Sequence, residues 1–158
     1  MVKGVSQPRE TSSRIEFCIL TKEKKAQSRA LGIVAYYQEH IPYTFGEALR
    51  MCMEKVKITV ADLSALTGIS DRQIGRMRND EAKDISFRTI VALCVALNLV
   101  AESAEKLLNI KRYTLNCDDP YVQVCKMFLE TRVTVVDCND ILKSCGYEPL
   151  TDGEIWAV

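Results

Sequence analysis

The apolar and polar positions of residues 44–112 repeat one local arrangement, in which a polar residue stands between two apolar ones. An apolar residue just before an N-cap and another in the first helical turn form a hydrophobic staple, which fixes where a helix begins. The repeat therefore predicts a series of helix starts and a mainly α fold. It is found at three places: Ile58 and Leu63 around Thr59, Ile69 and Ile74 around Ser70, and Ile85 and Ile90 around Ser86.

Capping-box spacing is a second signal for helix starts, because a side chain three residues after the cap can bond back to it. Helical periodicity of apolar residues follows each start. Together these signals predict five helices, at 45–56, 60–67, 71–79, 87–98 and 101–109. The boxes pair Thr44 with Glu47, Thr59 with Asp62, where Asp is the weaker match, and Ser70 with Gln73, and Ser86 is a further cap.

Three residues, Gly68 to Ser70, separate the second predicted helix from the third. Glycine takes the left-handed conformation that ends a helix sharply, and such a short turn is typical of a helix-turn-helix unit. Residues 62–80, DLSALTGISDRQIGRMRND, resemble the helix-turn-helix of the lambda repressor and Cro-like family, also called the xenobiotic response element family. The resemblance implies a five-helix DNA-binding domain over residues 44–112. It also implies structural roles for Ser64 between the helices, Gly68 in the turn, Ser70 as cap, and Ile74 and Met77 facing inward.

Three positions depart from the family pattern. Gly75 stands where the family often has Ser, Arg78 where Glu is common, and Asp80 in place of a terminal Gly. Gly75 costs about 1 kcal/mol of helix propensity relative to Ala. Asp80 is tolerable there because Asp enters the left-handed region more readily than most residues.

With Ile74 and Met77 inward, Arg72 and Arg76 lie one turn apart on the opposite side of the third helix. Arginine can donate two hydrogen bonds to guanine in the major groove, so these two residues are the predicted base contacts. Asp71 joins them, either as an acceptor for cytosine or as a partner of a neighbouring Arg. The competing interpretation of the arginines is a solvated charged face. Predicted contacts to the DNA backbone are Thr59, Ser70, Gln73, Arg78, Asn79 and Lys83.

Residues 113–158 predict a C-terminal helical extension. Asp119 and Pro120 are typical of a helix start, and a second start at Thr134 with Asp137 leads to a stop at Gly146. The resulting two-helix hairpin resembles the extension of some bacterial regulators of this family. Its apolar residues either cover the five-helix core or form a dimer surface: Val122, Val124, Phe128, Leu129, Ile141 and Leu142.

Residues 1–43 form an N-terminal extension with weaker signals. Residues 14–20 fit a short strand and residues 26–40 a helix, without capping or turn residues that fix either. The charge is uneven along a chain of zero net charge: residues 113–158 contain 3 Lys and Arg against 8 Asp and Glu. We therefore expect this acidic segment to face away from DNA or toward a protein partner.

The sequence offers no chemistry for an enzyme. It has no HExxH, no GxSxG, no phosphate-binding glycine loop and a single histidine, His40. The seven cysteines contain no CxxC pair, which favours reduced core thiols over a zinc site. We expect no catalytic residue, no cofactor and no metal. Without a secretory signal or a long apolar run, the expected location is the cytoplasm.

These observations predict a sequence-specific, repressor-like transcriptional regulator that binds double-stranded DNA as a homodimer. The alternative is a helix-turn-helix fold used as a protein-interaction module, similar to an antitoxin or the partner of an anti-repressor, with weak DNA binding. The zero net charge and the acidic extension favour the alternative. Three arginines on one helix, at positions 72, 76 and 78, favour DNA.

Overall fold

The computed structural model describes Lys22 and residues 44–155. The strand expected at 14–20, the helix expected at 26–40, His40 and Cys18 lie outside the described residues. Lys22 donates from its backbone to the carbonyl of Asn98 at 3.3 Å and from its side chain to the carbonyl of Thr131. This lysine of the N-terminal extension therefore contacts the turn between the two helices of the C-terminal hairpin.

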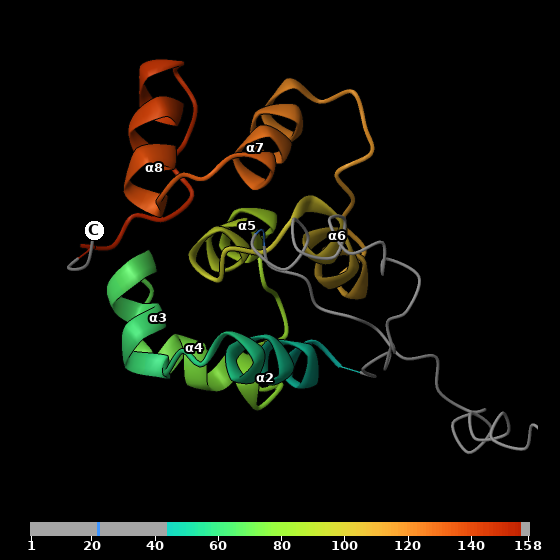
Figure 1. Cartoon of the computed structure of the whole chain (residues 1–158), viewed down its shortest axis with the longest axis vertical. Coiled ribbons are helices and arrows are strands. Elements are labelled where there is room, and N and C mark those ends of the chain that lie inside the picture. Colours follow the sequence, from blue (N-terminus) through green and yellow to red (C-terminus); the bar gives the residue numbers. More distant parts are fainter. Residues whose placement is uncertain (1–21, 23–43, 156–158) are drawn as a thin grey trace, which may run out of the picture.

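The described part of the chain is helical, which confirms the predicted fold class (Figure 1). The predicted helices are present with small changes at their C-terminal ends, because the last turn of a helix is set by capping geometry more than by periodicity. The helices are α2 (Phe45–Val56), α3 (Val60–Thr67), α4 (Asp71–Arg78), α5 (Phe87–Ala96), α6 (Ala101–Ile110), α7 (Pro120–Glu130) and α8 (Val135–Ser144).

Polar caps begin most of these helices. The hydroxyls of Thr44, Ser70 and Ser86 each accept the backbone N–H three residues later. The complete reciprocal box is present at Thr59 with Asp62 and at Thr134 with Asp137. The boxes built on Asp, which the sequence rules rank as the weaker match, are thus fully formed.

Left-handed residues end several helices. Gly68 ends α3 at φ 78°, and Asp80 follows α4 at φ 58°, as the sequence predicts for both. Lys57, at φ 62°, ends α2 without being glycine or asparagine. No sequence signal marked this last position.

The helices form three layers, with α5 and α6 between α2 to α4 on one side and α7 and α8 on the other (Figure 1). One buried cluster joins all three layers. It includes Leu49 from α2, Ile74 from α4, Leu93 from α5 and Leu142 from α8. Because α7 and α8 share this core, the extension covers the five-helix unit, which is the first of the two alternatives above.

Most apolar residues of the hairpin face that core, but not all. Phe128, Leu129 and Leu142 are buried, whereas Ile141 is 41% exposed. Met127 is 55% exposed, and it is not one of the apolar residues predicted to cover the core or to form a dimer surface. A dimer surface formed by the exposed part of the hairpin therefore stays a prediction.

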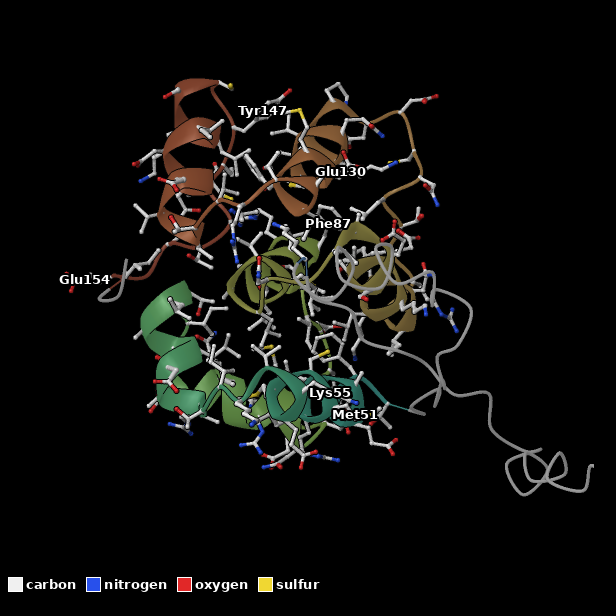
Figure 2. All side chains as sticks on the ribbon, in the orientation of Figure 1. Met51, Lys55, Phe87, Glu130, Tyr147 and Glu154 are labelled. Carbon is white, nitrogen blue, oxygen red and sulfur yellow. The ribbon has the colours of Figure 1, made fainter. Side chains whose placement is uncertain are left out.

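Aromatic side chains tie the hairpin to α5. Tyr121 of α7 packs edge-on against both Phe87 and Tyr147, with ring centroids 6.4 and 5.4 Å apart. Phe87 also meets Tyr113 at 5.8 Å. Figure 2 shows Phe87 at the boundary between the middle and upper layers and Tyr147 beside the upper helices.

Four of the six described cysteines are buried: Cys52, Cys94, Cys125 and Cys138. Burial raises the pKa of the Cys52, Cys125 and Cys138 thiols to about 12, so these side chains are protonated, packed groups at neutral pH. Among the helices that the structure describes, none is both long and apolar enough to cross a membrane.

Candidate nucleic-acid interface

The predicted recognition helix, α4, is placed by the turn before it and by its own apolar side. Gly68 ends α3, Ser70 caps α4, and Ile69 packs next to the start of the helix as a buried staple. Ile74 and Met77 are 0% and 4% exposed, which fixes the opposite side of this eight-residue helix toward solvent. The predicted inward pair is therefore buried as expected.

All three predicted base contacts lie on that outer side. Asp71, Arg72 and Arg76 are exposed, and the two arginines are one helical turn apart. Arg76 also donates to the carbonyl of Glu81 in the following loop, at 3.4 Å. This long hydrogen bond holds the guanidinium toward the loop, and a guanine contact would have to replace it.

A cleft of about 520 Å³ lies between the recognition helix and the start of α5. Gln73 and Arg76 line one wall, and Lys83 lies in the loop that closes it. Glu81 and Asp84 also line the cleft, so the residues around it carry charges of both signs. The structure thus places one predicted base contact and two predicted backbone contacts around the same cleft.

Three other residues predicted to contact the DNA backbone lie at the ends of helices, outside this cleft. Ser70 and Asn79 are exposed at the two ends of α4. Thr59 is exposed at the start of α3, where its hydroxyl and N–H both donate to the Asp62 carboxylate, at 2.7 and 3.0 Å. These bonds hold the pKa of Asp62 below its ordinary value. The ionised Asp62 therefore places a negative charge where a phosphate contact was predicted.

Arg78 is half-buried, unlike the arginines of the outer side. Its Nε is buried without a hydrogen-bond partner, and its carbonyl accepts from the guanidinium of Arg50 on α2. The Arg50 side chain thus bonds to the backbone at the end of α4. Arg50 was missed by sequence reasoning because it lies on a different helix and no local motif marks it.

Contacts at the same junction of α2 and α4 explain why residue 46 is glycine and what the side chain of Asp80 does. The backbone N–H of Gly46 donates to the Asp80 carboxylate at 2.8 Å, and the backbone of Gly46 lies against the carbonyl of Arg78. A Cβ at Gly46 would lie 2.5 Å from that carbonyl oxygen, so only glycine fits without a shift. Asp80 therefore joins the end of the recognition helix to the start of α2.

A segment after α8, which we call the strap (residues 147–155), crosses back to the helix-turn-helix turn. The hydroxyl of Thr151 donates to the carbonyl of Thr67 at 2.6 Å, and Gly153 lies against Gly68. Figure 2 shows Glu154 beside α3, next to the end of the described chain. Sequence reasoning missed this contact, because a hydrogen bond between residues 84 positions apart leaves no local signal.

Residues 48–100 match the family model of the Cro/C1-type HTH DNA-binding domain. The match extends from α2 to the start of α6 and contains the whole of α3, α4 and α5. This segment is similar to a helix-turn-helix domain of that type, and the match confirms the resemblance drawn from residues 62–80. No match to the chain was found among curated proteins or among solved structures.

Proposed function

We propose that this protein is a sequence-specific transcriptional regulator that binds the major groove of DNA with α4. The observation that carries the proposal is the pair of exposed arginines, Arg72 and Arg76, on a helix whose other side is buried. In helix-turn-helix docking this outer surface enters the major groove. The Cro/C1-type match supports DNA binding by the same segment.

The proposal assigns base recognition to Arg72 and Arg76, with Asp71 at the exposed start of the helix. Backbone contacts are assigned to Lys83, Gln73 and Asn79, together with the free N–H groups at the start of α4. Arg78 contributes less than the sequence suggests, because its guanidinium is half-buried at the α2 junction. Its positive charge acts on DNA mainly through the field at this surface.

The central test separates base recognition from attraction to phosphates. A double-stranded DNA ligand is first selected from a randomised pool by the wild-type protein. Arg72→Ala or Arg76→Ala is expected to cost about 1–3 kcal/mol on that duplex and to relax selection at one base pair. Lys83→Ala is expected to weaken selected and scrambled duplexes alike and to lower the salt slope by roughly 0.9.

Lys126→Ala is the matched control, because it removes one positive charge from α7, in the layer on the far side of α5 and α6 from α4 (Figure 1). It should leave both base selection and the salt slope unchanged. Circular dichroism must show that every variant remains folded. If Arg72→Ala and Arg76→Ala retain wild-type affinity and selection, the protein-interaction module becomes the better account of this fold.

A further inference from the structure

We propose that the strap positions the recognition helix by holding the turn between α3 and α4 through Thr151 and Gly153. The proposal rests on the proposed function, because it assigns to the C-terminal extension a role in DNA selection without contact to DNA. Its basis is the set of contacts that the strap makes at both of its ends.

Thr67, the last residue of α3, is the polar centre of the turn. It is 0% exposed, and its hydroxyl donates to the carbonyl of Leu63 at 2.7 Å and accepts the N–H of Ile69 at 3.1 Å. Carbonyls in the last turn of a helix have no partner within the helix and need one elsewhere. The Thr151 hydroxyl supplies that partner for the carbonyl of Thr67. The extension therefore completes the hydrogen bonding of the turn.

Gly68 and Gly153 lie with their backbones in contact. A Cβ built on Gly153 would be 1.9 Å from the carbonyl oxygen of Gly68, and a Cβ on Gly68 would be 2.7 Å from the carbonyl oxygen of Gly153. Gly68 also requires its left-handed φ of 78°, which favours glycine independently. Gly153 does not have a positive φ. Its missing side chain is explained by this close approach alone.

The strap is itself anchored to three helices, so it can transmit a fixed position to the turn. The N–H of Leu150 donates to the buried Asn139 side chain on α8 at 2.8 Å. Arg88 on α5 donates to the carbonyl of Pro149 at 2.6 Å, and Tyr121 on α7 donates to that of Glu148 at 3.3 Å. The turn is thus held by a segment that is itself bonded to α5, α7 and α8.

The position of α4 depends on this turn, because Gly68, Ile69 and Ser70 are all that separates it from α3. Bidentate contacts to a base require side chains placed to within about 0.5 Å, which a supporting shell must provide. Releasing the strap should let the start of α4 shift while the core stays folded. Base selection should then suffer more than attraction to phosphates.

The test compares Thr151→Val and Gly153→Ala with the conservative variant Thr151→Ser, which keeps the hydroxyl. Gly146→Ala is the control for general destabilisation, since it strains a φ of 81° in the same extension with nothing within 4 Å of the new Cβ. Two quantities are measured for each full-length variant. They are hydrogen exchange of the Ile69 amide, and affinity for the duplex selected by the wild type and for a scrambled duplex of equal length.

Thr151→Val and Gly153→Ala are expected to speed exchange at Ile69 roughly two- to tenfold and to weaken the selected duplex by a similar factor. Binding to the scrambled duplex should not change. Thr151→Ser should behave as the wild type, and Gly146→Ala should lower the melting temperature without either local effect.

Wild-type exchange at Ile69 in both strap variants would overturn the proposal. Equal weakening of selected and scrambled duplexes would also overturn it, because a merely stabilising contact predicts that result. If the wild type selects no duplex at all, the proposed function fails. In that case the exchange rates at Ile69 alone test whether the strap stabilises the turn.

Discussion

The backbone N–H of Gly46 and the carboxylate of Asp80 are joined by a hydrogen bond of 2.8 Å. Gly46 lies in the first turn of α2, and Asp80 follows the recognition helix at a φ of 58°. An N-terminal helical N–H has no partner within its own helix, so the carboxylate satisfies a buried group. Asp80 thereby has two roles: its left-handed backbone ends the path of α4, and its carboxylate joins this end of α4 to α2.

This relationship predicts different outcomes for two substitutions of Asp80. Asp80→Gly keeps the left-handed conformation but removes the acceptor, and it should lower the free energy of unfolding by about 1–3 kcal/mol. Asp80→Asn keeps both an acceptor oxygen and tolerance of that φ, so its loss should be smaller. Denaturant unfolding of the three proteins gives both values. Equal stability of Asp80→Gly and the wild type would contradict this prediction.

The helix starts could be predicted from sequence because each depends on residues within one turn of each other. Thr59 with Asp62 and Ser70 with Gln73 are examples, since cap and partner are three positions apart. The contact of Gly46 with Asp80 spans 34 positions, and that of Thr151 with Thr67 spans 84. Such pairs depend on how helices pack, which local spacing does not encode.

In the candidate site, too, local features could be predicted from the sequence and contacts between helices could not. The exposure of Arg72 and Arg76 follows from the buried Ile74 and Met77 on the same helix, so periodicity predicts it. The half-burial of Arg78 follows from the packing of α2 against the end of α4. Periodicity places a residue on a helix face, but only the neighbouring helix determines whether that face is covered.

The capping box at the start of α3 predicts a dependence of stability on pH. The Thr59 hydroxyl and N–H hold the pKa of Asp62 below its ordinary value of 3.8. A lowered folded-state pKa means that the box stabilises the protein above the unfolded pKa and loses this effect as pH falls through the folded one. Asp62→Asn should therefore be less stable than the wild type at pH 7, by a margin that shrinks below about pH 4.

Denaturant unfolding of both proteins across this pH range measures that margin. Thr59→Ala provides the control background, because it removes the hydroxyl that lowers the pKa of Asp62 most. In that background the pH-dependent part of the margin should decrease. A margin that is constant from pH 7 to pH 3 would contradict the assignment.

Gly75 predicts opposite effects on stability and on DNA binding. A Cβ there would meet nothing within 4 Å, so Gly75→Ala should gain about 1 kcal/mol of helix propensity without a clash. The longer Gly75→Gln should keep most of that gain and place bulk beside the DNA-binding surface. Its affinity for the selected duplex should fall while its unfolding midpoint rises or holds. Undiminished affinity of Gly75→Gln would place α4 away from the groove.

The last prediction concerns assembly on DNA. The recognition helix has eight residues, and one such helix contacts only a few base pairs. A selective site therefore needs two copies, and we expect a homodimer on an inverted repeat with half-sites roughly 34 Å apart. Sedimentation velocity with the selected duplex should give two protein chains per DNA.

Spacing provides a sharper check than stoichiometry alone. Inserting about 5 base pairs between the half-sites turns them to opposite sides of the helix, whereas about 10 restores the same side one turn further on. Paired binding should be lost with the shorter insertion, while each half-site keeps the affinity of an isolated one. A strict one-to-one complex would contradict the predicted homodimer. Paired binding that is unchanged by the insertion of about 5 base pairs would also contradict it.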